Sequence, residues 1–191
     1  WESADLTLVL QFISLCKSRC APAGSERARE EAQDFYSEQP CGQRTPALLV
    51  EAYARAEQLR QDRRMLTFDD MLLEMWKSLT NDELMLARWA AKWDYVLQDE
   101  CQDENMVQRE IAQMLAKQHG NYMVVGDPAQ AIYGFRGSDP SGMLSFQAKW
   151  SSAVVHMSSN YRSGRAIVKV ANRTLGAMTE GTHLGMQIKG E

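Results

Sequence analysis

The chain has 191 residues, of which 45% are hydrophobic and 24% charged, and its 21 basic and 25 acidic residues give a net charge of −4. These values are typical of a soluble globular protein with one domain or two small ones and a real core. The acidic balance argues against a small nucleic-acid module that binds by bulk electrostatic attraction, so any such contact must be local. Without a long apolar run or a signal-peptide pattern, we expect a cytoplasmic protein with no membrane contact.

The four cysteines do not form a recognisable metal-binding pattern. They are Cys16, Cys20, Cys41 and Cys101. Cys16 and Cys20 are one helical turn apart, but the two-residue spacing and the paired histidines of zinc sites are missing. We therefore expect ordinary reduced thiols and no metal held by cysteine.

The first third of the chain carries helix signals and no strand signal. Residues 5–17 are rich in apolar side chains and residues 25–36 are charged, and both stretches predict helices. Thr45 and Pro46 have the residue types of an N-cap and a first-turn proline, so a third helix is expected to run to about residue 64. A helical subdomain over residues 1–65 is the resulting prediction.

Two capping signals follow. Thr67 with Asp70 predicts the start of a helix over residues 68–79, and Thr80 with Glu83 predicts another running to about residue 92. Acidic side chains at a helix start are favoured by the helix dipole, so Asp69 and Asp70 receive no catalytic role.

Three short apolar runs, residues 95–97, 122–125 and 153–157, predict strands, and residues 106–118 between the first two predict a helix. This βαβ order predicts an α/β fold with a parallel sheet. A polar motif follows each run: Asp99-Glu100-Cys101-Gln102-Asp103, then the stretch from Gly126 to Gly137, then Asn160-Tyr161-Arg162-Ser163. One cleft at the carboxyl ends of the strands is expected to gather all three.

Together with residues 66–72 (Leu-Thr-Phe-Asp-Asp-Met-Leu), these motifs resemble the UvrD/Rep-type superfamily 1 DNA helicases in residue type, order and spacing. The resemblance is specific from about residue 66 to residue 176 and faint before it. It implies a partial parallel sheet of the RecA-like, P-loop NTPase type. Residues 1–65 would then be the end of a helical insertion, with a plain helical cap as the alternative. Residues 66–150 would be the second half of the first motor domain, and 151–191 the start of the second.

The resemblance also assigns roles to residues. Asp99 would hold Mg²⁺, Glu100 would orient the attacking water, and Gln130 would sense the γ-phosphate of ATP. Tyr161 would lie against the adenine ring, and Arg162 would place its guanidinium on the γ-phosphate. Alternatives without a catalytic role remain open. Acidic residues also occur in the solvated turns that follow strands, and Asn160 or Ser163 would also suit a helix N-cap.

The DNA-contacting residues implied by the resemblance are Tyr133, Phe135 and Arg136. The two aromatic rings would stack on bases of single-stranded DNA, and Arg136 would pair with Glu100 or another carboxylate of the site. Core packing of the rings and a solvated arginine are the alternatives.

The chain departs from the family pattern in three ways. Glu104 stands where the acidic motif usually has threonine, and Ala131 stands where the second motif usually has serine. The phosphate-binding sequence Gly-x-x-x-x-Gly-Lys-Ser/Thr is missing. We therefore expect an internal slice that does not hydrolyse ATP alone, partnered by the remaining helicase domains.

The complete protein is expected to be an ATP- and Mg²⁺-dependent translocase. It would act on single-stranded DNA and duplex junctions with 3′ to 5′ polarity, in the cytoplasm and associated with the nucleoid. The alternatives are a non-catalytic DNA- or protein-binding remnant and the motor part of a helicase–nuclease.

Overall fold

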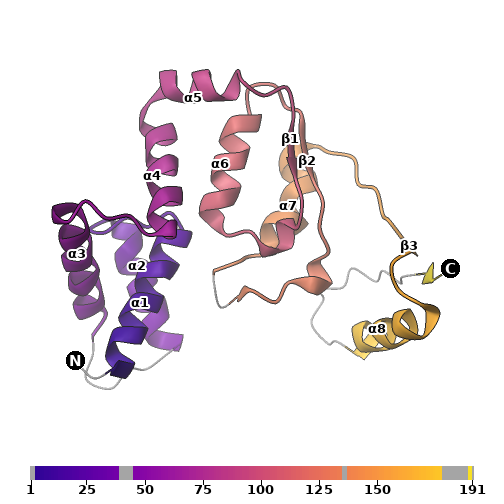
Figure 1. Ribbon diagram of the computed structural model, residues 1–191, viewed down its shortest axis with the longest axis horizontal. Helices are drawn as coiled ribbons and strands as arrows, with labels where there is room; N and C mark the ends of the chain where they lie inside the picture. Colours follow the sequence, from indigo (N-terminus) through magenta and orange to yellow (C-terminus); the bar gives the residue numbers. More distant parts are fainter. Residues whose placement is uncertain (1–2, 39–44, 135–136, 178–188, 191) are drawn as a thin grey trace.

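The computed structural model describes residues 3–38, 45–134, 137–177 and 189–190. The described part is mostly helical, with two short pairs of parallel strands (Figure 1). The helices are α1 (Ser3–Ser18), α2 (Glu26–Glu38), α3 (Pro46–Asp62), α4 (Phe68–Asn81), α5 (Glu83–Ala90), α6 (Met106–Ala116), α7 (Ser141–Trp150) and α8 (Arg165–Ala177). The strands are β1 (Val96–Gln98), β2 (Tyr122–Val124), β3 (Ser159–Asn160) and β4 (Lys189–Gly190), and the short 3₁₀ helices are η1 (Cys101–Asp103) and η2 (Pro128–Gln130).

Helices α1, α2 and α3 pack together around a core of aromatic and small side chains. Phe12 is fully buried, with its ring centroid 5.6 Å from that of Phe35 and 6.3 Å from that of Tyr53. Thr45 caps α3 by accepting a hydrogen bond from the amide of Leu48, with Pro46 in the first turn. The three helices predicted for this part of the chain are confirmed.

A buried network of charges ties this helical subdomain to α4. The Nζ atom of Lys17 lies 2.7 Å from Oε1 of Glu57 and 2.5 Å from Oδ1 of Asp70. Arg60 closes the network, with its Nη2 atom 3.0 Å from Glu57 and its Nε atom 3.4 Å from Asp70. Because buried charges are costly unless paired, these contacts hold α1, α3 and α4 in one arrangement.

The predicted capping box at the start of α4 is confirmed: Thr67 accepts a hydrogen bond from the amide of Asp70, whose carboxylate accepts one from the amide of Thr67. The second capping prediction is wrong in its residue. Thr80 lies inside α4, where its hydroxyl donates to the carbonyl of Trp76, and Asp82 caps α5 instead. The Asp82 carboxylate accepts a hydrogen bond from the amide of Met85, and α5 ends at Ala90.

The predicted βαβ unit is confirmed for the first two strands. β1 and β2 pair in parallel, with Val96, Leu97 and Gln98 opposite Tyr122, Met123 and Val124. Helix α6 connects them and lies between α4 and the strand pair (Figure 1). On another side, the Tyr122 ring packs edge-on against Phe146 and Trp150 of α7, at 5.1 Å from each.

The third predicted strand, residues 153–157, is wrong. These residues have no regular secondary structure, and the strand β3 begins later, at Ser159, where it pairs with β4. Val155 and Met157 are 85% and 78% exposed. Apolar β-branched residues favour strands only when a neighbouring strand pairs with them, and within the described residues no strand lies beside this run.

None of the helices in the described ranges has the length and apolar character that a membrane crossing requires.

Substituting Asp70 by asparagine should lower the free energy of unfolding by about 3 kcal/mol, because it removes a carboxylate from a buried ion pair. Burial alone would raise the pKa of Asp70, but hydrogen bonds from Lys17 and Thr67 outweigh it and leave the pKa below its usual 3.8. The contribution of Asp70 to stability is therefore present above pH 3.8 and is lost as the pH falls below that value. Urea denaturation at several pH values measures both effects.

Asp69→Asn is the matched control. Asp69 is next in sequence, but its carboxylate accepts a hydrogen bond from the Ser14 hydroxyl at 2.6 Å and takes no part in the ion pairs. The prediction fails if the two variants lose equal stability.

Candidate functional site

The acidic motif begins where β1 ends. Asp99 and Glu100 are both exposed, and Oδ1 of Asp99 accepts a hydrogen bond from the amide of Glu100 at 2.9 Å. Glu100 has φ 52° and ψ 37°, the left-handed conformation, which costs a non-glycine residue roughly 1–2 kcal/mol. Such strain recurs at functional sites, where the surrounding structure maintains it.

Gln102 joins the acidic motif to the second motif. Its side chain is 1% exposed; its Nε2 atom donates to the carboxylate of Glu100 at 2.7 Å, and its Oε1 atom accepts from the amide of Asp127 at 3.0 Å. The amide of Cys101 adds a hydrogen bond to the carbonyl of Val125 at 3.0 Å. The two motifs are therefore fixed to each other by both side-chain and backbone contacts.

The second motif presents Gln130 from a hydrogen-bonded turn. Asp127 caps η2 by accepting a hydrogen bond from the amide of Ala129 at 3.0 Å, and its other carboxylate oxygen accepts from Nε2 of Gln130 at 2.8 Å. The side chain of Gln130 remains exposed. The structure thus brings Asp99, Glu100 and Gln130 to the same end of the strand pair.

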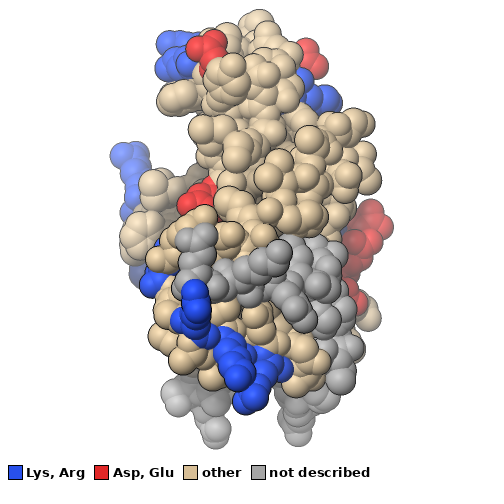
Figure 2. Space-filling model, turned by 90° about the vertical axis from the view of Figure 1, so that its right-hand side faces the viewer, with Lys and Arg blue, Asp and Glu red and all other residues tan. Residues whose placement is uncertain are grey.

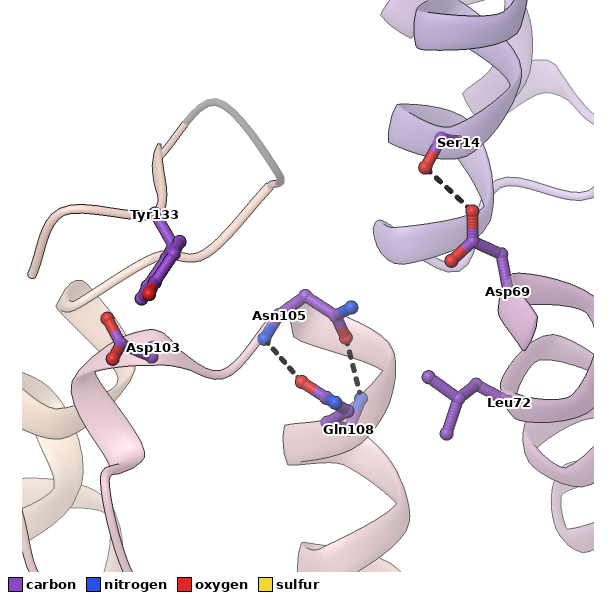
Figure 3. A pocket seen from close by; sticks show the side chains of 7 residues that line it. All are labelled: Ser14, Asp69, Leu72, Asp103, Asn105, Gln108 and Tyr133. Carbon is purple, nitrogen blue, oxygen red and sulfur yellow. Dashed lines mark hydrogen bonds between the residues drawn. The ribbon is translucent and has the colours of Figure 1, made fainter.

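Tyr133 lines a pocket of about 480 Å³ beside these motifs (Figure 3). The other lining residues are Ser14, Asp69, Leu72, Asp103, Asn105 and Gln108. Tyr133 and Asp103 lie on one side, and Asp69 with Ser14 on the other, across the capping box formed by Asn105 and Gln108 (Figure 3). Tyr133 is 37% exposed, so it is not a residue of the closed core. Phe135 and Arg136 lie outside the described residues.

The third motif is not brought to the first two. Oδ1 of Asn160 accepts hydrogen bonds from the amides of Arg162 and Ser163, at 3.0 and 2.8 Å, which forms a turn just before α8. Tyr161 is 80% exposed and Arg162 is also exposed. Within the described ranges, no hydrogen bond or ion pair links Tyr161 or Arg162 to Asp99, Glu100 or Gln130.

Helix α8, which follows this turn, is rich in exposed basic residues. Figure 2 views the molecule from the side on which α8 lies and shows Lys and Arg atoms grouped in the lower part of that face, at the level of α8. The exposed basic residues between positions 160 and 177 are Arg162, Arg165, Lys169 and Arg173, and this stretch contains no acidic residue.

Comparison with known proteins places these motifs in a family. The family model described as UvrD/REP helicase N-terminal domain matches residues 11–151. The chain belongs to the UvrD/REP helicase family. The matched range includes the acidic motif and the second motif, and it begins within α1, so the helical subdomain belongs to the family domain as well.

Individual relatives agree with this family. The chain is 37% identical over 121 residues to a protein of Bacillus subtilis named putative ATP-dependent DNA helicase YjcD, a match that covers 63% of the chain and 16% of that protein. It is 33% identical over 151 residues to the ATP-dependent DNA helicase PcrA of Staphylococcus epidermidis, covering 78% of the chain and 20% of the relative. It is 35% identical over 112 residues to the ATP-dependent DNA helicase Rep of Buchnera aphidicola, covering 58% of the chain and 17% of the relative. The chain thus spans a fifth or less of each of these relatives.

Two residues of this UvrD/REP site were not singled out by sequence reasoning. In the sequence, Gln102 is one residue of the acidic motif and Glu104 is a departure from the family pattern. Both residues are buried, at 1% and 7% exposed. Both are polar residues next to buried neighbours in the segment between β1 and α6. Nothing in the sequence indicates this burial, because Asp127 and Asp139, which hydrogen-bond to Gln102 and Glu104, lie 25 and 35 positions further along the chain.

Gly126→Ala should disrupt the junction between the two motifs. A Cβ atom at Gly126 would lie 2.4 Å from Oε1 of Gln102 and 2.8 Å from Sγ of Cys101, closer than real side chains approach. Since this overpacking forces Gln102 away from Asp127, we expect a loss of about 1–3 kcal/mol of stability, measured by thermal unfolding.

Gly134→Ala is the control, because no heavy atom lies within 4 Å of the Cβ position there. Equal melting temperatures for the two variants would contradict the close packing at Gly126.

Proposed function

We propose that the complete protein is an ATP-dependent DNA helicase that couples hydrolysis of Mg-ATP to movement along single-stranded DNA and to unwinding at duplex junctions. The observation that carries this proposal is the Gln102 bridge, which holds Glu100 and the turn bearing Gln130 in one unit. Phosphoryl transfer needs this kind of fixed arrangement of carboxylate and amide groups. The names of the relatives, all ATP-dependent DNA helicases, support the same activity.

Asp99 is the proposed ligand of Mg²⁺. Magnesium is usually held in proteins by one or two carboxylates together with phosphate oxygens and water, so the single exposed Asp99 at the end of β1 is a sufficient protein ligand. The bound ion would supply charge neutralisation at the phosphates. Glu100 is the proposed residue that orients the attacking water, and Gln130 the one that touches the γ-phosphate.

Tyr133 is the proposed DNA contact, at the pocket that Asp103 of the acidic motif also lines. A partly exposed aromatic ring at the edge of a pocket is suited to stacking on a base, which is tolerant of sequence. By the same family resemblance, Phe135 and Arg136 are proposed to extend this contact.

Tyr161 and Arg162 are proposed to complete the nucleotide site from the second motor domain. Their exposure supports this role, since an exposed aromatic face and an exposed guanidinium can receive adenine and phosphate. The proposed division is a helical insertion over residues 1–65, the second half of a RecA-like domain over 66–150, and the start of another from 151. The proposed polarity is 3′ to 5′, and the proposed location is the cytoplasm, at the nucleoid.

In the complete protein, Glu100→Gln should lower the kcat of ATP hydrolysis about 100-fold or more, because the amide cannot act as a base toward water. ATP binding should persist, since Asp99 and Gln130 remain. Steady-state hydrolysis with and without single-stranded DNA, and equilibrium binding of ATP, are the measurements.

Glu83→Gln is the control, because Glu83 is exposed at the start of α5 and takes no part in the motifs. Full turnover by Glu100→Gln would contradict the proposed enzyme. Single-strand binding by a wild-type protein that has no ATPase activity would favour the binding-module alternative.

Tyr133→Ala should weaken binding of single-stranded DNA by about 1–3 kcal/mol, the usual worth of one stacked base, while Tyr133→Phe should retain binding. Fluorescence anisotropy with a labelled oligonucleotide measures the affinity. Tyr95→Ala is the control, since Tyr95 is 67% exposed just before β1 and does not line the pocket of Tyr133. Equal affinities for Tyr133→Ala and Tyr95→Ala would remove Tyr133 from the DNA contact.

A further inference from the structure

Glu104 occupies the junction between the acidic motif and α6. It follows η1 directly, precedes the N-cap residue Asn105, and is 7% exposed. Its neighbours Asp103 and Asn105 face the pocket that contains Tyr133, whereas the Glu104 side chain is buried on the side of the strands. The residue therefore lies between the proposed DNA contact and the proposed nucleotide site.

The side chain of Glu104 holds the last residue of β1. Its carboxylate accepts a hydrogen bond from Nε2 of Gln98, and Oε1 of Gln98 accepts one from the hydroxyl of Tyr122 at 2.5 Å. Burial, with the nearby carboxylate of Glu104, raises the pKa of Tyr122, so this hydroxyl remains a donor. Since Gln98 immediately precedes Asp99, this chain of hydrogen bonds sets the position from which the acidic motif leaves the strand.

The backbone of Glu104 and Asn105 contacts Ser138 and Asp139, which come five and six positions after Tyr133 in the chain. Its carbonyl accepts a hydrogen bond from the amide of Asp139 at 3.1 Å, and the next residue, Asn105, forms a bridge with Ser138. Arg109 reinforces this contact by donating to the carbonyl of Asp139 at 3.1 Å and to its carboxylate at 3.2 Å. Any shift of this segment therefore acts directly on Glu104.

The positions of Gln98 and Arg109 depend on the buried carboxylate of Glu104. Burial raises the pKa of Glu104, while the hydrogen bond from Gln98 and the charge of Arg109 act in the opposite direction. A buried carboxylate is tolerated only while its partners are in place, so Gln98 and Arg109 are constrained to one geometry around it.

We propose that Glu104 is a positioning residue that couples DNA contact at the Tyr133 segment to the acidic motif, through Gln98 on one side and the backbone of Asp139 on the other. This inference rests on the proposed function, because it assumes that Tyr133 contacts DNA and that Asp99 and Glu100 serve ATP hydrolysis. Glu104 itself touches neither ligand.

The test is the stimulation ratio of the complete protein, defined as the kcat of ATP hydrolysis with saturating single-stranded DNA divided by the kcat without DNA. Glu104→Ala and Gln98→Ala should each lower this ratio about 10-fold, which is within the range of measured couplings between sites. The double variant should lose no more than either single variant, because both substitutions break the same link. Glu104→Gln should keep most of the ratio, since its side-chain oxygen still accepts from Gln98.

A purely structural role would give a different pattern. In that case the melting temperature would fall, both rates would fall together, and the ratio would stay unchanged, which would overturn the proposal. Multiplying effects in the double variant would overturn it too. If Glu104→Ala fails to fold, Gln98→Ala decides the question by the same ratio.

Glu110→Ala is the matched control on α6 and should leave the ratio unchanged; an equal loss there would also overturn the proposal. A wild-type protein without DNA-stimulated ATPase activity would overturn the proposed function, and this inference with it. Wild-type stimulation together with unaffected variants at Glu104 and Gln98 would overturn this inference alone.

Discussion

The hydrogen bonds of one side-chain amide, that of Gln102, determine how the two described motifs relate to each other. The amide is buried and uses both its donor and its acceptor, one for the carboxylate of Glu100 and the other for the backbone of Asp127. A buried amide left half satisfied would cost free energy, so the two loops are stable only in this relative position. Gly126 permits it, because any larger residue would occupy the space of the Gln102 oxygen.

A second constraint operates at the first turn of α4. The ion pairs of Lys17 with Glu57 and Asp70 place the helical subdomain against the first turn of α4, and the same turn supplies Asp69 to the pocket of Tyr133. The helical subdomain therefore contributes one wall of that pocket. The helical subdomain is thus tied to the shape of the proposed DNA contact.

The sequence predicted those elements whose signals are local. Thr45 with Pro46 and Thr67 with Asp70 marked helix starts correctly because a cap involves residues only a few positions apart. The strands β1 and β2 were predictable because a helix of suitable length separates them. The strand predicted at residues 153–157 is absent from the structure, because apolar composition does not indicate whether a partner strand is present.

The candidate site, too, could be predicted only in part. Asp99, Glu100 and Gln130 came from motif resemblance, and the structure gathers them at one end of the strand pair. The burial of Gln102 and Glu104 could not be predicted, because their partners Asp127 and Asp139 lie 25 and 35 positions along the chain and meet them only after the strands pair.

The left-handed backbone at Glu100 has a consequence for how this protein could change over time. Glycine or asparagine would adopt that conformation with little strain, so selection for thermal stability alone would favour them over glutamate at this position. Selection for activity would oppose that drift if the carboxylate is needed. The residue type at position 100 therefore depends on the balance between selection for stability and selection for activity. With glutamate there, the stability of this site is not at its maximum.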